Sequence, residues 1–283
     1  MPACIYCQTE NNAPSIEHVV AEALGGCLKL PADAVCKPCN NRILGDEIDV
    51  PVRNDLEQLL VEHGIAGKSG EAATMILTHT DSEEGERRYL VSKDEIGSAE
   101  MRKLVSQAGS TYRFRATSPE ELERARAAIQ AKNPGRQVVL GEIEERLPDV
   151  PDGYFREVNF GAAHWSRWAA KTCLNLIAFM WGPDAARLTE FDALRVHAFR
   201  GGLVPNALAF GGCGSGAANA DETAAEHRIE LKAESGRVFV KMTAFDFCGF
   251  TFEGQAPLTP VLRRIVLDAT HARIASDYSR SGL

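Results

Sequence analysis

Two cysteine pairs near the start of the chain constrain its fold more than any other feature. Cys4 and Cys7 form one pair, Cys36 and Cys39 form the other, and 28 residues separate the pairs. A gap of two residues lets both thiolates of a pair reach one ion, and two such pairs complete a tetrahedral four-sulfur zinc site. We therefore expect a structural Zn²⁺ ion, because four protein ligands leave no open position for chemistry.

The rest of the composition fits a reduced, soluble, globular chain. Of its 283 residues, 45% are hydrophobic and 25% charged, and no apolar run reaches the roughly 18 residues that a membrane span needs. No secretion signal is recognisable at the start, so we expect a cytoplasmic protein whose remaining four cysteines are core or bystander residues. The net charge of −8 repels nucleic acid at long range, so any nucleic-acid binding must come from local patches or bound metal.

Between the cysteine pairs lies EHVVAEALGG, at residues 17–26. SIEHVV predicts a short strand, the glycines after it predict a sharp turn, and NNRILGDEID predicts a helix with Asn40 in its first turn. Glu17, His18 and Asn40 can thus converge. Carboxylate and amide oxygens suit Mg²⁺ or Mn²⁺, and an imidazole can take a proton from water near neutral pH. The alternative for a Glu-His pair is a surface strand with a buried or solvated histidine.

Taken together, CIYC, EHVVAEALGG and VCKPCNNRILGDEID resemble the cysteine-framed branch of the HNH endonucleases, over residues 3–50. The resemblance implies two strands and a helix around a catalytic metal. It also implies that His18 is the general base that activates water, and that Glu17 and Asn40 bind the catalytic Mg²⁺ or Mn²⁺. The family's middle asparagine, which braces the loop and orients the base, has no clean match at residues 31–34, and Ala21 stands where the family commonly has proline.

Local charge bears on how a phosphate would be bound. Residues 1–50 contain three basic and seven acidic side chains, so the segment is acidic. Arg42 lies on the same predicted helix as Asn40 and could bind a substrate phosphate. An exposed, salt-bridging role fits Arg42 about equally well.

The predicted fold class is α+β, with an HNH module at residues 1–50 and a larger mixed α+β domain at residues 51–283. Periodicity predicts helices at residues 52–64, 118–135, 162–181 and 191–202, strands at residues 74–80, 87–92, 111–117, 226–234, 236–245 and 247–253, and a closing helix at residues 259–276. One polar stripe, His164, Arg167, Lys171 and Asn175, interrupts the apolar helix at residues 162–181. We favour a solvated helix face for it over a basic edge that faces a ligand.

These observations favour a metal-dependent endonuclease that hydrolyses phosphodiester bonds, in DNA rather than RNA. By resemblance we expect a role in bacterial defence or restriction, with residues 51–283 selecting the target or sensing a small-molecule signal. A homodimer is expected for a double-strand cut, because each active site can nick one strand. Two alternatives stay open: a zinc-ribbon module that binds nucleic acid or protein without cleaving it, and a separate small-molecule sensor or enzyme to which the zinc part is attached.

Overall fold

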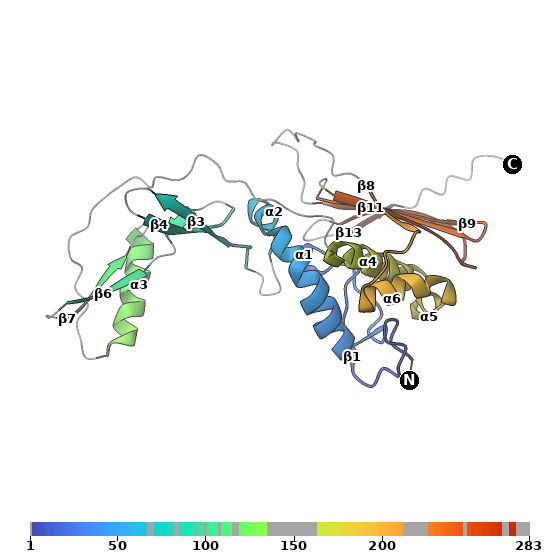
Figure 1. The fold of residues 1–283 in the computed structure, drawn as a ribbon, viewed down its shortest axis with the longest axis horizontal. Helices are drawn as coiled ribbons and strands as arrows, with labels where there is room; N and C mark the ends of the chain where they lie inside the picture. Colours follow the sequence, from blue (N-terminus) through green and yellow to red (C-terminus); the bar gives the residue numbers. More distant parts are fainter. Residues whose placement is uncertain are drawn as a thin grey trace. The chain divides into compact units, whose positions relative to one another are not determined.

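Figure 1 shows the fold in a computed structural model of the chain. Helices and antiparallel sheets are both extensive, so the predicted α+β class is confirmed. The structure describes residues 2–66, 71–81, 85–93, 96–98, 101–106, 109–114, 119–134, 163–211, 226–245, 248–267 and 272–275.

The chain forms two compact units. Residues 1–71 and 158–283 build the first unit, and residues 72–157 build the second. The N-terminal residues therefore share one unit with the C-terminal part of the chain. The predicted division of function at residue 50 stays a prediction.

The first unit begins with little regular structure. Strand β1 (Pro14–Ser15) pairs with β2 (Val35–Cys36), and the short helix η1 (Glu22–Leu24) lies between them in sequence. The strand predicted over SIEHVV is limited to β1 and a single bridge between His18 and Lys29. Backbone hydrogen bonds on both sides of that bridge, from Val19 to Leu28 and from Leu30 to Glu17, hold the segment extended without making it a longer strand. We call residues 2–49 the cysteine frame.

The helix predicted after the second cysteine pair is present, but its first part is a π-helix. Element η2 (Cys39–Asp49) buries Leu44 and Ile48 on one side. It continues into α1 (Val50–Asp55), which has a proline in its first turn, and then into α2 (Glu57–Glu62). The wider turn of a π-helix shifts the side chains around the axis relative to an α-helix, and sequence periodicity does not reveal that shift.

The described residues of the second unit form three strands in one sheet, two strands in another, and a helix. The strands predicted at residues 74–80 and 87–92 are present, and they pair with each other. The strand predicted at residues 111–117 and the helix predicted at residues 118–135 are present as far as the chain is described there, and the middle of the predicted turn DSEEGE lies outside the described residues. The bounds are β3 (Met75–Asp81), β4 (Gly85–Val91), β5 (Ile96–Ser98), β6 (Met101–Ser106), β7 (Gly109–Phe114) and α3 (Pro119–Lys132).

A helical layer follows in the first unit. Helix α4 (Ala163–Trp181) ends at Gly182, which has a φ of +90° that favours glycine. The layer continues with α5 (Pro183–Ala186), η3 (Thr189–Phe191) and α6 (Asp192–Arg200). Among the described helices, none is long and apolar enough to cross a membrane.

One six-stranded antiparallel sheet covers this layer (Figure 1). Its order is β13-β12-β9-β10-β11-β8, and Trp168 of α4 meets Phe250 of the sheet with ring centroids 5.9 Å apart. Burial alternates along β9 and β10, so one sheet face packs inward and the other carries polar side chains. The strands are β8 (Leu208–Gly211), β9 (His227–Glu234), β10 (Arg237–Ala244), β11 (Cys248–Gln255), β12 (Val261–Leu267) and β13 (Ala272–Ala275).

The predicted helix at residues 259–276 is wrong, since this segment forms β12 and β13. Strand β12 pairs with the free edge of β9, so its backbone groups are bonded by the sheet. Ile265 and Leu267 alternate with more exposed neighbours and enter the core. A short segment with apolar residues fits both the helix periodicity and the strand periodicity. The segment forms strands here because the edge of β9 is available for pairing.

Candidate active site and zinc centre

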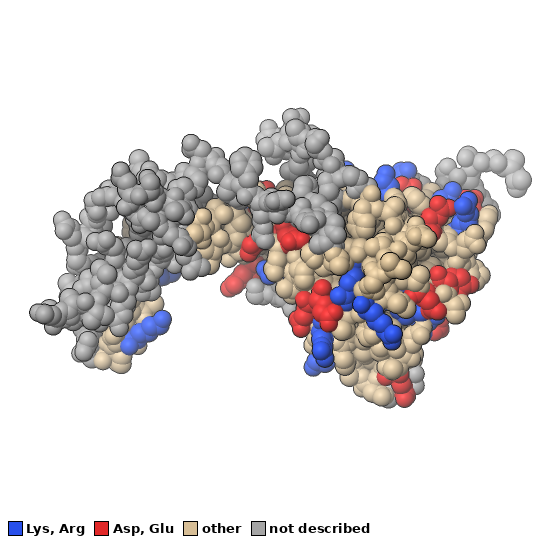
Figure 2. All heavy atoms as spheres, in the orientation of Figure 1, with Lys and Arg blue, Asp and Glu red and all other residues tan. Residues whose placement is uncertain are grey.

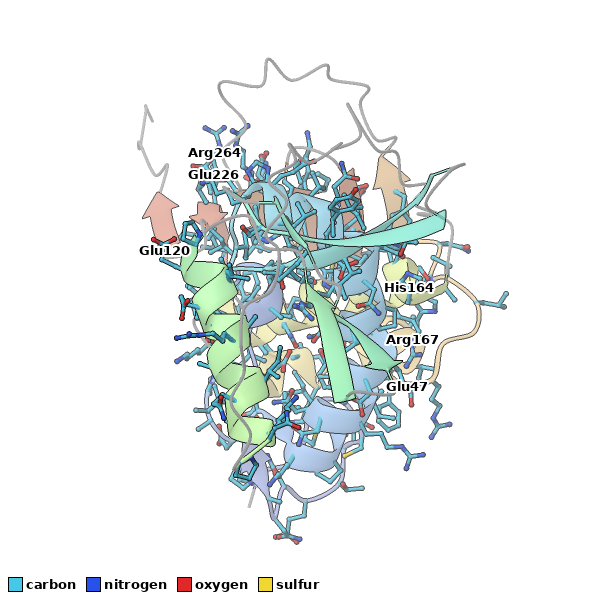
Figure 3. All side chains as sticks on the ribbon, turned by 90° about the vertical axis from the view of Figure 1, so that its left-hand side faces the viewer. Glu47, Glu120, His164, Arg167, Glu226 and Arg264 are labelled. Carbon is cyan, nitrogen blue, oxygen red and sulfur yellow. The ribbon has the colours of Figure 1, made fainter. Side chains whose placement is uncertain are left out.

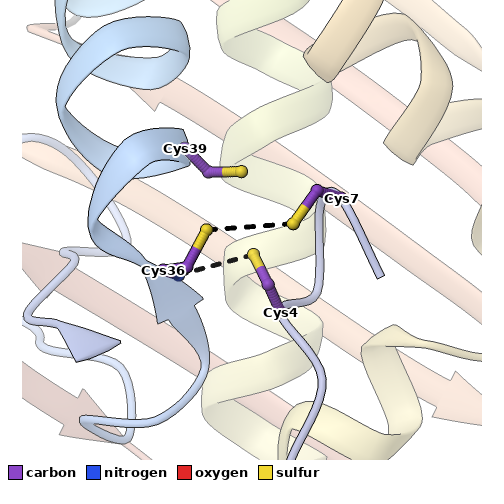
Figure 4. Close-up of side chains that lie close together, drawn as sticks. All are labelled: Cys4, Cys7, Cys36 and Cys39. Carbon is purple, nitrogen blue, oxygen red and sulfur yellow. Dashed lines mark hydrogen bonds between the residues drawn. The ribbon is translucent and has the colours of Figure 1, made fainter. Parts of the chain in front are cut away.

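The four cysteines of the two pairs come together at one point (Figure 4). Their sulfur atoms all lie within 4.8 Å of one another, and the Sγ atoms of Cys7 and Cys36 are 3.8 Å apart. Four thiolates around a tetrahedral zinc ion with Zn–S bonds of about 2.3 Å would be separated by about 3.8 Å. The donor set and its spacing therefore fit Zn²⁺, as predicted.

The charge state of the thiols also fits a cation. A hydrogen bond from the Cys39 thiol lowers the pKa of Cys4 to about 4, and the same contact raises the pKa of Cys39. Burial raises the pKa of Cys36. Crowded thiols thus oppose ionising together, and a bound divalent cation removes that opposition because it favours every thiolate at once. Elsewhere among the described residues no other cluster of three or more His, Cys, Asp or Glu side chains has this closeness.

Two glycines shape the loop that follows the Glu-His pair. Gly25 has a φ of +81°, which ends η1 in a left-handed conformation. At Gly26 a Cβ atom would lie 1.9 Å from the carbonyl oxygen of Val20, so a side chain there would collide with backbone. This close approach folds the chain back so that His18 can pair with Lys29.

Glu17 is buried, with 5% of its surface exposed, and its carboxylate faces α4. Its Oε1 atom lies 2.8 Å from Nζ of Lys171 and accepts a hydrogen bond of 3.2 Å from Nδ2 of Asn175. Both contacts use Oε1, so Oε2 is the oxygen with which Glu17 could bind a metal. The sequence predicted the carboxylate but not its buried cationic partner.

His18 is half-buried beside Glu17. Burial lowers the pKa of its imidazole below the ordinary value of 6.5, while the nearby carboxylates of Glu22 and Glu17 act in the opposite direction. The imidazole is therefore neutral at pH 7, the form in which histidine can accept a proton from water.

Asn40 lies at the start of η2 and contacts the same segment. Its Nδ2 atom donates hydrogen bonds to Ser15 Oγ at 2.9 Å and to the carbonyl oxygen of Ile16 at 2.7 Å. Both hydrogen bonds come from Nδ2, which leaves Oδ1 as its possible metal ligand. Arg42, two residues further along, is exposed to solvent, where a phosphate could reach it. The proposed roles of Asn40 and Arg42 stay predictions.

The polar stripe of α4 is not a solvated face, and that interpretation is corrected. Lys171 and Asn175 are fully buried against the cysteine frame, while Arg167 contacts Glu47 at 3.1 Å. His164 Nε2 lies 2.7 Å from Asp55 Oδ2, and Figure 3 shows Glu47, Arg167 and His164 following one another along one side of the unit. The stripe is polar because it binds the charged groups of η2, α1 and the Glu17 loop.

Lys171 is the most deeply buried charge of this interface. Its Nζ atom lies 2.5 Å from Asp49 Oδ2 and 2.8 Å from Glu17 Oε1. Burial alone would lower the pKa of Lys171, but the two carboxylates outweigh it and the pKa is raised. Burial raises the pKa of Asp49 to about 6 against the opposing effect of Lys171. Sequence reasoning missed this trio, although a lysine inside an otherwise apolar helix is a signal that a buried partner exists.

Further contacts join the frame to the C-terminal part of the unit. Arg195 donates a 2.8 Å hydrogen bond from Nε to the carbonyl oxygen of Ile5, and Arg187 donates to that of Ala3. His227 of β9 lies 2.6 Å, through Nε2, from the carbonyl oxygen of Leu24. The frame is therefore packed into a larger unit and does not stand alone.

Residues 4–57 match the family model described as HNH endonuclease. No curated protein and no solved structure matches the chain significantly. The match covers the cysteine cluster, the Glu-His loop, η2 and α1, so the resemblance seen in the sequence is confirmed for this domain. It supports a nuclease-type function.

Proposed function

We propose that the HNH endonuclease domain at residues 4–57 is catalytic and hydrolyses phosphodiester bonds of nucleic acid, with DNA as the preferred substrate. The observation that carries this proposal is the position of His18. Within residues that match a nuclease family, the cysteine frame holds a half-buried imidazole beside a carboxylate. Such a pair suits activation of a water molecule next to a divalent ion.

In this proposal each residue has one role. His18 accepts the proton of the attacking water, and Glu17 and Asn40 hold the catalytic ion through Oε2 and Oδ1. Oxygen donors of this kind suit Mg²⁺ or Mn²⁺. When bound, such an ion stabilises negative charge on the scissile phosphate and the leaving oxygen. The four cysteines hold Zn²⁺ outside the reaction and keep the loop in place.

Arg42 is the proposed contact to a neighbouring phosphate. Acidic and basic side chains are interspersed on the coloured surface in Figure 2, and the chain carries a net charge of −8. Long-range attraction of DNA is therefore weak, and binding depends on short-range contacts such as Arg42 and on the metal. Because few phosphates are neutralised by basic side chains, we expect the affinity for DNA to fall only modestly as salt is added.

The wider setting of the reaction is also part of the proposal. We propose that residues 51–283 select the target or sense a small-molecule signal, and that two copies act together when both strands are cut. A cytoplasmic role in bacterial defence or restriction would be consistent with such an arrangement.

The test is nicking of supercoiled plasmid by the purified protein with Mg²⁺, with Mn²⁺ and with EDTA. We expect metal-dependent nicking that is lost in His18→Ala while the zinc content stays that of the wild type. His63→Ala is the control, because His63 is also half-buried but lies at the end of α2. Equal nicking by wild type and His18→Ala would contradict the assignment of the base.

One observation favours a second function. The carboxylate of Glu17 is engaged by Lys171 and Asn175, as a structural carboxylate would be. In that case the domain is a zinc-stabilised module that binds nucleic acid without cleaving it. Plasmid binding by zinc-loaded wild type that does not nick in any metal, and equal binding by His18→Ala, would support this alternative.

A further inference from the structure

We propose that Asn175 and Lys171 of α4 are positioning residues for the Glu17–His18 pair. This inference rests on the proposed nuclease function and adds residues from outside the matched domain, since α4 begins at Ala163 and the match ends at residue 57. The two side chains act through the loop and are not assigned a contact with substrate.

Asn175 contacts both the Glu17–His18 pair and Tyr6, which belongs to the first cysteine pair's loop. Its Nδ2 atom donates to the carbonyl oxygen of His18 at 2.9 Å and to Oε1 of Glu17 at 3.2 Å. Its Oδ1 atom accepts a 2.5 Å hydrogen bond from the hydroxyl of Tyr6, which lies between Cys4 and Cys7. One amide therefore links the first cysteine pair to the Glu-His pair.

The carbonyl groups on the two sides of Glu17 are held by different amides. Asn40 donates to the carbonyl oxygen of Ile16, and Asn175 donates to that of His18. Two fixed carbonyls restrict rotation of the peptide units around Glu17, and so limit where the carboxylate and the imidazole can point. The first amide belongs to the matched domain and the second does not.

Lys171 fixes the carboxylate itself. Its Nζ atom lies close to Oε1 of Glu17 and to Oδ2 of Asp49, so it joins the loop to the C-terminal end of η2. Because both α4 side chains use Oε1, they orient Glu17 with Oε2 as the remaining oxygen. A buried, paired carboxylate in one orientation is a pre-organised ligand, whereas a free glutamate samples several rotamers.

The test compares Asn175→Ala and Asn175→Asp with the wild type. Asn175→Asp keeps an acceptor for Tyr6 but loses the amide N–H groups that bond Glu17 and the carbonyl oxygen of His18. Both Asn175 variants should therefore hold the Glu17–His18 loop less firmly. Thr172→Val and Ser166→Ala are matched controls on the same helix. The buried hydroxyl of Thr172 has no hydrogen-bond partner among the described residues, and Ser166 bonds His197 and Ala163 instead of the loop. All five proteins are first compared for zinc content and for thermal unfolding.

Two readouts separate positioning from a general loss of structure. In the Asn175 variants we expect faster backbone hydrogen exchange at residues 16–20, with residues 3–9 still protected and zinc still bound. We also expect kcat for plasmid nicking to fall by about 100-fold while KM for plasmid changes little, because a displacement of about 1 Å is enough for such a loss. The controls should match the wild type in both readouts.

Unchanged exchange at residues 16–20 together with an unchanged kcat would overturn the inference. So would a loss of zinc or a kcat defect of equal size in Ser166→Ala, because the effect would then be general. Hydrogen exchange requires no activity, so it decides whether α4 holds the loop even where the wild type fails to nick plasmid. Failure of the wild type to nick would contradict the proposed function separately.

Discussion

The cysteine frame and the six-stranded sheet belong to the same compact unit but are held together in different ways. In the frame, β1 and β2 have two residues each, and order depends on four thiols and on side chains such as Asn40, Lys171 and Asn175. In the sheet, β9, β10 and β11 pair over eight residues through their backbones. A region whose order depends on a few side chains can lose its geometry when one contact is removed, whereas in a long strand ladder the remaining backbone hydrogen bonds keep the geometry.

Loss of the metal should give the largest difference between the two regions. A structural zinc contributes on the order of 10 kcal/mol to folding, so Cys39→Ser should unfold the frame while most of the sheet stays protected. Hydrogen exchange resolved by peptide would measure both regions in one experiment. Cys173→Ser, at a buried cysteine outside the cluster, should keep its zinc and its frame. Zinc-free protein with a fully protected frame would contradict this prediction.

Removal of the buried cation should give the next largest effect. Lys171→Met leaves Glu17 and Asp49 buried without their partner, and breaking a buried pair from one side costs about 3–5 kcal/mol. Urea unfolding would measure the change. Lys241→Met on β10 changes the same residue types at an exposed position and should cost far less. Equal costs for the two variants would show that the Lys171 contacts add nothing to stability.

The contact between the sheet and the loop should depend on pH. Burial lowers the pKa of His227 from 6.5 to about 4, so between these values the unfolded chain binds a proton that the folded protein does not. Stability from this residue is complete above pH 6.5 and is lost as the pH falls toward 4, at about 1.4 kcal/mol per pH unit. His227→Gln keeps a neutral donor for Leu24, so from pH 6.5 to 5 it should gain about 2 kcal/mol relative to the wild type. Parallel pH profiles of unfolding free energy for the two proteins would refute this.

An exposed ion pair on the sheet should give the smallest effect. Arg237 and Glu253 lie 2.8 Å apart on neighbouring strands, but their side chains are 69% and 57% exposed. Solvent screens such pairs, so Arg237→Ala should change the free energy of unfolding by less than about 1 kcal/mol. A loss as large as that of Lys171→Met would mean that burial does not explain the contrast between the regions.

Local patterns in the sequence predicted much of the fold. The spacing of Cys4, Cys7, Cys36 and Cys39 was sufficient to predict their cluster, and alternation predicted β9, β10 and β11. Residues 259–276 failed because a short apolar segment satisfies both helix and strand periods, and the edge of β9 is not visible from local sequence. A prediction was correct where the contacts that determine the element lie close together in the sequence, and wrong where they lie far apart.

The candidate site shows the same limit. Glu17, His18 and Asn40 were proposed from their positions around the cysteines, but Asn175, which donates hydrogen bonds to Glu17 and His18, is 158 residues from Glu17. No bracing asparagine was found at residues 31–34, and the structure instead places two amides, Asn40 and Asn175, on the loop carbonyls. Hydrogen bonds such as those of Asn175 depend on packing between distant elements, which helix periodicity alone does not encode.

The long separation of Glu17 from Asn175 has a consequence for the order of events during synthesis. A ribosome that has completed all four cysteines must still translate more than a hundred residues before α4 exists, and the His227 contact lies 203 residues beyond Leu24. At a synthesis rate of roughly 5–20 residues per second, several seconds or longer pass between the synthesis of the cysteine frame and that of the helix that buries Glu17. The Glu17 loop of a nascent chain therefore cannot adopt the geometry it has in the finished protein until the C-terminal half of the chain has emerged from the ribosome.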